Sequence, residues 1–286
     1  MHVMKLIECP RDAMQGLSEF IPTQTKTDYI NSLLNVGFDT IDFGSFVSPK
    51  AIPQLKDTAQ VLEGLDLSTT KSKLLAIVAN LRGAQDASAH DAINYLGYPF
   101  SISEEFQKRN TNATLDESLK RVEDIQSICS KSGKELVVYI SMAFGNPYGE
   151  AWHPNIAAEW SRRLAEELEV KIIALSDTIG SSSKETIQPL FETLVPEFND
   201  VEFGAHFHTT QDLWRSKVDA AYQAGCRRYD GAIRGFGGCP MATDDLTGNM
   251  PTENLLTYFR ENHVELGLDE EAFQRSFSHA GKVFPL

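Results

Sequence analysis

The stretch Val201-Glu202-Phe203-Gly204-Ala205-His206-Phe207-His208 is predicted to be a buried strand that ends in two histidines. Its aromatic and β-branched residues favour an extended chain. Side chains alternate between the faces of a strand, so His206 and His208 should point the same way, about 7 Å apart at Cα. Two imidazoles at that spacing can bind one metal ion or one substrate. The alternative is a pair of hydrogen-bonded histidines at the rim of the core.

On both sides of this stretch, apolar strands alternate with amphipathic helices. We predict strands at residues 3–9, 38–43, 73–79, 95–102, 135–142, 170–175, 201–208 and 228–233. We predict helices at residues 23–36, 52–65, 85–93, 103–130 with an interruption near 110–114, 155–168, 184–198, 212–224, 252–262 and 269–280. Eight strand–helix units spaced by about 30 residues predict an α/β fold, a (β/α)8 TIM barrel with an extra C-terminal helix. A doubly wound sheet, the alternative, usually has fewer strands. No shift in composition marks a second domain, so residues 1–286 should form a single barrel domain.

The composition limits the partners and the compartment of the protein. The net charge of −14 argues against a nucleic-acid or anionic-membrane partner, and an anionic ligand would need a local positive pocket. No apolar run approaches the roughly 18 residues of a membrane span, and the N-terminal apolar run is too short for a signal peptide. The four cysteines show neither close pairing nor zinc-site spacing. We therefore expect reduced thiols and a cytoplasmic protein.

Polar residues collect where the predicted strands end, which is where a TIM barrel carries its chemistry. They are Arg11, Asp12, Asp42, Asp177, His206, His208, Cys239 and Asn249. Asp12, His206 and His208 offer oxygen and nitrogen ligands suited to Mg²⁺, Mn²⁺ or Zn²⁺. An amide oxygen from Asn249 could complete the set.

Simpler interpretations of these acids and amides stay open at this point. In the simpler interpretation, Asp12 only pairs with Arg11 or caps a turn. Asp177 would cap a turn or a helix. Asn249, which follows Gly248, would only be a turn residue.

The segment Gly237-Gly238-Cys239-Pro240 is the second informative feature. Two glycines ahead of a cysteine let the backbone approach a ligand closely and leave the thiol unshielded. Cys129 and Cys226, by contrast, lie in apolar surroundings typical of inert thiols. The pattern therefore predicts a functional role for Cys239.

The motifs quoted above, taken in chain order, carry a resemblance to a known family. The chain resembles the hydroxymethylglutaryl-CoA lyases from about residue 5 to residue 260. The residues that carry it are Arg11-Asp12, Ser45-Phe46-Val47-Ser48-Pro49-Lys50, Ser176-Asp177-Thr178-Ile179-Gly180, His206 with His208, Gly237-Gly238-Cys239-Pro240 and Gly248-Asn249.

The resemblance implies a divalent metal, Mg²⁺ or Mn²⁺, and an acyl-CoA substrate. It implies that Asp12, His206, His208 and Asn249 hold the metal. It further implies cleavage of 3-hydroxy-3-methylglutaryl-CoA into acetyl-CoA and acetoacetate, a cytoplasmic homodimer, and a part in leucine degradation.

The same resemblance implies how the residues act. Arg11 would lie near the thioester oxygen, and Cys239 would protonate the enolate carbon from a mobile loop. The base that takes the hydroxyl proton would be Asp42, Asp177 or His206. We expect substrate contacts from three side chains: Arg11, Gln15 and Arg234.

The sequence departs from the family's pattern in three places. Asp42 stands where the familiar lyases have Glu, Thr209-Thr210-Gln211-Asp212 replaces Asp-Thr-Tyr-Gly, and Arg234 replaces a small uncharged residue. Asp42 and Arg234 support a first rival hypothesis, a related lyase or Claisen-type synthase that acts on another acyl-CoA or 2-oxo acid. A second rival is a non-catalytic barrel that binds a metal or CoA, and the intact Arg11, Asp12, His206, His208 and Cys239 argue against it.

Overall fold

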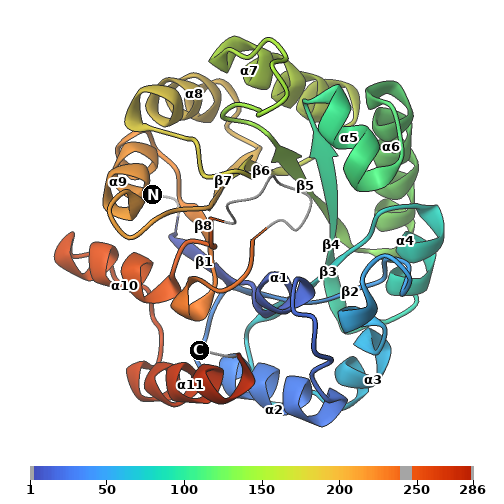
Figure 1. The fold of residues 1–286 in the computed structure, drawn as a ribbon, viewed down its shortest axis with the longest axis vertical. Coiled ribbons are helices and arrows are strands. Elements are labelled where there is room, and N and C mark those ends of the chain that lie inside the picture. Colours follow the sequence, from blue (N-terminus) through green and yellow to red (C-terminus); the bar gives the residue numbers. More distant parts are fainter. Residues whose placement is uncertain (1–2, 239–246, 285–286) are drawn as a thin grey trace.

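The computed structural model describes residues 3–238 and 247–284, in which eight parallel strands close into a barrel (Figure 1). Each strand pairs with the next one along the chain, and β1 pairs with β8 to close the ring. The strands are β1 Lys5–Glu8, β2 Thr40–Ser45, β3 Lys73–Ile77, β4 Ile93–Ser101, β5 Glu135–Ser141, β6 Ile172–Asp177, β7 Glu202–Phe207 and β8 Arg228–Gly231. The predicted TIM barrel is confirmed, including its fourth strand.

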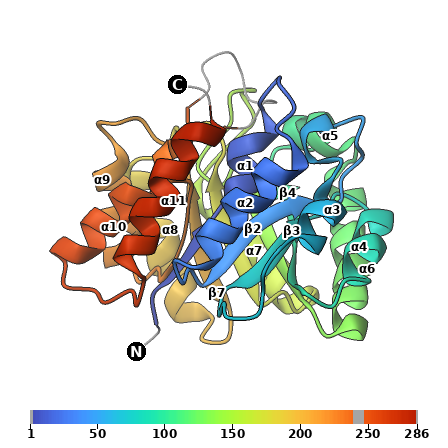
Figure 2. The same ribbon diagram turned by 90° about the horizontal axis from the view of Figure 1, so that it is seen from below.

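Helices form an outer ring around the strands (Figure 1). They are α1 Pro10–Gln15, α2 Thr23–Leu34, α3 Thr58–Glu63, α4 Leu81–Ser88, α5 Glu104–Thr111, α6 Leu115–Ser132, α7 Pro154–Arg162, α8 Lys184–Glu197, α9 Trp214–Gln223, α10 Thr252–Glu261 and α11 Glu270–Val283, with short turns η1 Pro53–Leu55, η2 Arg163–Glu167 and η3 Ile233–Gly235. The extra C-terminal helix is α11, which packs against α2 (Figure 2). Within the described residues, every helix is too short or too polar to cross a membrane.

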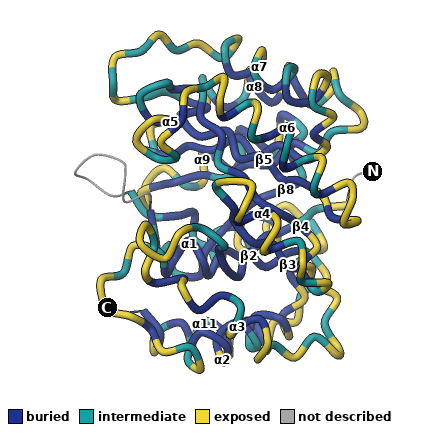
Figure 3. Tube along the Cα trace, turned by 90° about the vertical axis from the view of Figure 1, so that its right-hand side faces the viewer, coloured by how far each residue is buried: buried dark blue, intermediate teal, exposed yellow. Residues whose placement is uncertain are grey.

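Alternation along the strands divides the apolar side chains into two layers. Leu74 and Ala76 of β3 belong to the large cluster that includes the buried helix faces, whereas Leu75 and Ile77 belong to a smaller cluster. Successive residues of a strand face opposite sides, so the smaller cluster fills the barrel and the larger one joins barrel to helices. The strands are accordingly buried along most of their length (Figure 3).

The helix predicted at residues 52–65 is divided into η1 and α3. The buried side chain of Lys26 explains the break. Its ammonium donates to the backbone oxygen of Gln54, the acceptor that an uninterrupted helix would use, and it also pairs with Asp57 at 2.7 Å. The buried ammonium of Lys26 is therefore hydrogen-bonded at the expense of one turn of helix.

A short helix that the sequence analysis did not predict, α1, follows the first strand directly. Pro10 occupies its first turn, a position that tolerates a missing N–H and a fixed φ. Arg11 and Asp12 therefore lie on a helix and not in an open loop. In Figure 2, α1 sits at one end of the barrel, opposite the end near the N-terminus.

Candidate active site

The carboxyl end of the barrel encloses a cavity of about 320 Å³. Arg11, Asp12 and Gln15 reach it from α1, and His206 and His208 reach it from the end of β7. The two imidazole rings are 5.6 Å apart between centroids. Both histidines face the cavity, as strand alternation predicts.

A carboxylate and two imidazoles form the part of the cavity that fits a metal ion. One ligand atom from each of Asp12, His206 and His208 lies within 4.8 Å of the other two. One oxygen donor and two neutral nitrogen donors, with room beside them for substrate or water, suit a divalent ion such as Mn²⁺ or Mg²⁺. On donor chemistry and spacing, the residues present fit the expected metal.

The surroundings of Asp12 and His208 favour the protonation states that bind metals. Burial by itself would raise the pKa of Asp12, but the positive charges of Arg11 and the histidines outweigh it and lower the pKa to about 2. Burial lowers the pKa of His208 to about 4, and repulsion from His206 adds to the shift. At neutral pH, Asp12 is thus a carboxylate and His208 a neutral imidazole, as metal binding requires.

Asp230 on β8, which the sequence analysis missed, contacts the ring nitrogen of His206 that is not directed towards Asp12. The strand register places Asp230 beside His206, and its Oδ2 lies 3.0 Å from His206 Nδ1. A proton shared along that contact leaves the lone pair of Nε2 directed towards Asp12, whose Oδ2 is 3.9 Å away. Burial would lower the pKa of His206, but the hydrogen bond to Asp230 reverses the shift and raises it. Asp230 therefore fixes the tautomer and orientation of a candidate ligand.

Cys9, His206 and Asp230 form a second group with metal-ligand spacing. Burial and the negative charges of nearby aspartates raise the pKa of the Cys9 thiol well above its usual value. Since thiolate is the form that binds metals, this group is the poorer candidate.

Replacing Asp230 by asparagine should weaken metal binding with little change of shape. We expect the Kd for Mn²⁺, measured by isothermal titration calorimetry, to rise about 10- to 100-fold, the usual effect of losing the outer partner of a ligating histidine. The control is Asp200→Asn, because Asp200 lies in an exposed ion pair with Lys171. An unchanged Kd in Asp230→Asn would show that this aspartate does not support the metal site.

Asn249 contacts one of the three candidate ligands, Asp12. Its Nδ2 donates to Asp12 Oδ2 at 2.7 Å and to the Phe236 oxygen at 2.9 Å, which leaves its amide oxygen for a further contact. Gly237 has a φ of +97°, and a Cβ there would lie 2.6 Å from Asn249 Nδ2 and 2.7 Å from the Asp12 oxygen. Gly237 is thus needed because its backbone lies against Asn249 and the Asp12 backbone, while the close approach to a ligand stays a prediction.

Arg11 is held at the cavity by acids on two sides. Its Nε lies 3.0 Å and its Nη2 2.5 Å from Asp42 Oδ2, while Nη1 donates to Asp12 at 2.7 Å and to Gln15 Oε1 at 2.9 Å. Burial raises the pKa of Asp42 to about 6, and the charge of Arg11 offsets only part of that rise. Arg11, Asp12, Asp42 and Gln15 therefore form one largely buried network, which includes the pairing of Arg11 with Asp12 that the sequence left open.

Asp177 does not join this network. It is almost fully buried, and Ser182 donates to it from both its backbone N–H and its hydroxyl. Lys217 of α9, buried as deeply, pairs with Asp177 Oδ2 at 2.6 Å and donates to the carbonyl oxygens of Gly180 and His208. Asp177 is absent from the cavity lining. These contacts join the ends of β6 and β7 to α9, and the catalytic role expected for Asp177 stays a prediction.

Replacing Lys217 by methionine should therefore destabilise the fold. The change leaves Asp177 buried without its cation, which costs about 3–5 kcal/mol for pairs of this kind. We expect the midpoint of thermal unfolding to fall by roughly 5–15 °C. Lys171→Met, which breaks the exposed pair with Asp200, should change stability by about 0–1 kcal/mol. Equal midpoints for Lys217→Met and Lys171→Met would refute the structural role.

Arg234 also lies away from the cavity. Its guanidinium carbon is 4.6 Å from the ring centroid of Phe277 on α11, and its backbone N–H donates to Glu253 at 3.0 Å. The side chain lies against the outer helix and is absent from the cavity lining. The structure therefore places Arg234 apart from the other candidate site residues, and its expected contact with substrate stays a prediction. Cys239, the remaining predicted catalytic residue, lies outside the described residues.

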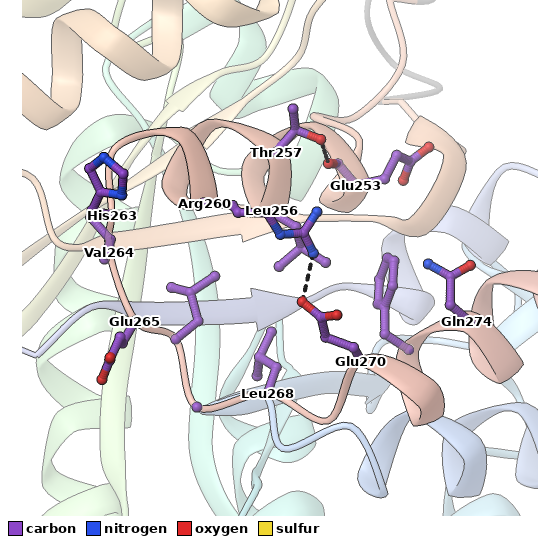
Figure 4. Close-up of a pocket in the computed structure, with 13 residues that line it drawn as sticks. Glu253, Leu256, Thr257, Arg260, His263, Val264, Glu265, Leu268, Glu270 and Gln274 are labelled. Carbon is purple, nitrogen blue, oxygen red and sulfur yellow. Dashed lines mark hydrogen bonds and ion pairs between the residues drawn. The ribbon is translucent and has the colours of Figure 1, made fainter.

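A second cavity, of about 680 Å³, lies between α10 and α11 on the outside of the barrel (Figure 4). Arg260 pairs with Glu270 across it at 2.8 Å, and Thr257 donates to the backbone oxygen of Glu253. None of the predicted site residues that the structure describes lines this cavity. The site of interest is therefore the one at the carboxyl end of the strands.

The chain is similar to proteins of known activity over most of its length. A family model described as HMGL-like matches residues 5–277. The cytoplasmic 3-hydroxy-3-methylglutaryl-CoA lyase of Rattus norvegicus is 31% identical over 267 residues, which is 93% of this chain and 77% of that protein. A Pseudomonas aeruginosa protein named 3-hydroxy-3-isohexenylglutaryl-CoA/hydroxy-methylglutaryl-CoA lyase is 28% identical, with 94% of this chain and 89% of that protein covered. The structure of an HMG-CoA lyase from Acinetobacter baumannii in complex with coenzyme A and 3-methylmalate matches with a TM-score of 0.90 and 28% identity, over 98% of this chain and 91% of that chain.

Proposed function

Because the chain belongs to the HMGL-like family, we propose that it is a carbon–carbon lyase that cleaves 3-hydroxy-3-methylglutaryl-CoA into acetyl-CoA and acetoacetate. The observation that carries the proposal is the single cavity in which Arg11 lies beside Asp12, His206 and His208. The cleavage needs a site that takes the proton of the tertiary hydroxyl, stabilises the enolate of acetyl-CoA and then protonates it.

Arg11 is the residue we assign to the enolate. Its guanidinium is the one Lys or Arg side chain among the residues that line the cavity. Asp42, Asp12 and Gln15 hold its planar guanidinium at the cavity, and its N–H donors are the ones we assign to the charge that develops on the thioester oxygen. Donors directed at such a charge commonly supply about 10²- to 10³-fold in rate.

Asp42 is the best of the three candidates for the base. Asp177 is fully engaged by Lys217 and Ser182, and His206 is held between Asp230 and Asp12. The raised pKa of Asp42, about 6, suits a base that works near neutral pH. Like Asp177, Asp42 does not line the cavity, but the side chain that covers it is Arg11, so we infer that Arg11 turns towards the thioester when substrate binds and exposes the carboxylate.

A divalent ion bound by Asp12, His206 and His208 would act as a Lewis acid on the substrate hydroxyl and lower its pKa. We keep Asn249 as the fourth proposed ligand because of its contact with Asp12. Cys239 remains the proposed donor of the proton to the enolate carbon, on the chemistry of an unshielded thiol behind two glycines.

The other predicted properties are part of the same proposal. We propose an acyl-CoA substrate, as in the coenzyme A complex of the similar lyase structure, and a cytoplasmic location, as in the name of the rat relative. Mg²⁺ or Mn²⁺ as the native ion, a homodimer, one catalytic domain over residues 1–286 and a part in leucine degradation stay predictions from the family resemblance.

An assay of the full-length protein with Mn²⁺ tests the proposal. Acetyl-CoA would be measured with citrate synthase and acetoacetate with its dehydrogenase, for hydroxymethylglutaryl-CoA and for a panel of other acyl-CoA esters. Equal amounts of both products from hydroxymethylglutaryl-CoA are expected. Release of acetyl-CoA only from another ester would favour the related lyase. Binding of CoA esters without turnover would favour the non-catalytic alternative.

A further inference from the structure

Arg228, at the start of β8, is a cation buried inside the barrel below the candidate site. Its side chain is fully buried, and its Nη1 donates to Glu202 Oε1 at 2.9 Å. Glu202 is shared with Lys5, which pairs with its other oxygen. Nε and Nη2 of Arg228 have no hydrogen-bond partner among the described residues. The pair with Glu202 therefore uses only part of a guanidinium whose burial is costly.

Gly204 on the neighbouring strand makes room for this side chain. The strand register pairs Gly204 with Arg228 and His206 with Asp230. A Cβ at Gly204 would lie 2.9 Å from Arg228 Cδ and 3.1 Å from its Cγ. The stem of Arg228 thus occupies the place where β7 would otherwise carry a side chain, one layer below His206 and about 7 Å away along the strand.

Asp230 lies two residues after Arg228 and therefore on the same face of β8. Its Oδ2 contacts His206 Nδ1, whereas its Oδ1 has no hydrogen-bond partner among the described residues. Tyr139, whose ring meets His206 edge-on at 5.6 Å between centroids, has a buried hydroxyl that also lacks one. Ordered water commonly completes the hydrogen bonds of such groups. The interior below His206 thus holds a cation, a carboxylate and a hydroxyl whose protein contacts are incomplete.

The charge of Arg228 acts more strongly on Asp230 than on Glu202. Burial would lower the pKa of Arg228, but nearby groups, with Asp230 contributing most, outweigh it and raise the pKa. The side chain of Glu202 is 29% exposed and that of Asp230 only 1%, and opposite charges attract more strongly away from water. Arg228 and Asp230 make no direct hydrogen bond in the described structure, so the attraction acts through space or through bound water. Arg228 is therefore the main counter-charge of Asp230.

We propose that Arg228 is a positioning residue for the metal site, because its charge holds Asp230 in the place from which Asp230 orients His206. The inference rests on the metal site of the proposed function and adds a residue that does not line the cavity. A buried carboxylate that loses its counter-charge is strongly destabilised. Without Arg228, Asp230 would move towards other donors or water, and His206 would lose the contact that orients it. Metal affinity would then fall.

The test is the Kd for Mn²⁺, measured by isothermal titration calorimetry on the full-length protein and on three variants of Arg228. Arg228→Met removes the charge and keeps a long stem, and Arg228→Gln removes the charge and keeps a donor for Glu202. In both, the Kd should rise at least about fivefold, and by no more than the 10- to 100-fold of losing the outer partner itself. Arg228→Lys keeps the charge and loses only the fork of donors, so its Kd should stay within about threefold of wild type. Wild-type affinity in Arg228→Met or Arg228→Gln would overturn the inference.

The matched control is Glu202→Gln, which separates positioning from a purely structural role. It removes the ion-pair partner of Arg228 and leaves the charge of Arg228 beside Asp230. Because Glu202 is partly exposed, its loss should change stability little, and the Kd for Mn²⁺ should stay within about twofold of wild type. Midpoints of thermal unfolding would be measured for every variant. If Glu202→Gln weakened Mn²⁺ binding as much as Arg228→Met, the effect would come from the lost ion pair, and the positioning role would be refuted.

A double-mutant cycle shows whether Arg228 acts through Asp230. Arg228→Met added to Asp230→Asn should change the Kd of that variant by less than about twofold, because the residue through which Arg228 acts has already been altered. The same loss in the Asp230→Asn protein as in the wild type would overturn the inference and leave the metal site intact. If the wild-type protein bound no Mn²⁺, the metal site of the proposed function would itself fail, and the inference with it.

Discussion

Arg11→Lys should yield a folded protein that has lost about 10²- to 10³-fold in kcat. Lysine keeps the positive charge between Asp42 and Asp12, so the buried network loses little of its Coulomb attraction. An ammonium cannot, however, reproduce the planar fork of donors that Arg11 directs at both acids and at Gln15. The loss should therefore fall on catalysis and not on folding.

Three measurements on Arg11→Lys separate these effects: kcat, KM and the midpoint of thermal unfolding. We expect a large fall in kcat with a change of only a few degrees in the midpoint. The control is Arg162→Lys, which alters an exposed ion pair with Glu197 on the outer helices. Near-native turnover in Arg11→Lys would mean that Arg11 only pairs with its neighbouring acids.

Cys239→Ser should lower kcat by about two to four powers of ten, the usual range for removing a positioned proton donor. The proposed metal ligands and the barrel do not include the thiol, so metal content and secondary structure should be unchanged. Alkylating reagents should inactivate the wild-type enzyme, and a non-cleavable acyl-CoA analogue should protect it.

The other cysteines provide the comparison for this labelling. Cys129 and Cys226 are buried, and burial raises the pKa of each thiol to about 12. Both should react slowly, because the thiolate is the nucleophile. Labelling that maps to Cys129 or Cys226, or normal turnover by Cys239→Ser, would show that Cys239 has no catalytic role.

Local sequence patterns were enough to predict the barrel and the two histidines. The repeat of strands and helices depends on periodicity within short windows, and the shared face of His206 and His208 depends only on alternation within one strand. The same alternation explains why Asp177 lies away from the cavity. Its neighbour Ser176 faces the cavity, so Asp177 must face the helices, where Lys217 meets it.

The residues that the sequence did not reveal act through partners far away in the chain. Asp230 supports His206 only because the register of β7 and β8 sets them side by side. Lys217 meets Asp177 only because α9 packs over the end of β6. Arg234 lies away from the cavity for a related reason: its φ of +65° turns the chain after β8, and its side chain then lies against α11. Single-sequence patterns carry no information about such pairings.

The measurement that tests the account most directly is the dependence of hydroxymethylglutaryl-CoA cleavage on a bound divalent ion. The protein would be stripped with a chelator, assayed, and titrated with Mn²⁺ while metal content is followed by mass spectrometry. We expect activity to vanish on stripping and to return at about one ion per chain. In His206→Ala, metal content should fall and turnover should drop about a hundredfold or more, roughly 3 kcal/mol of transition-state stabilisation. Full turnover by metal-free protein, or unchanged metal content and activity in His206→Ala, would contradict the account.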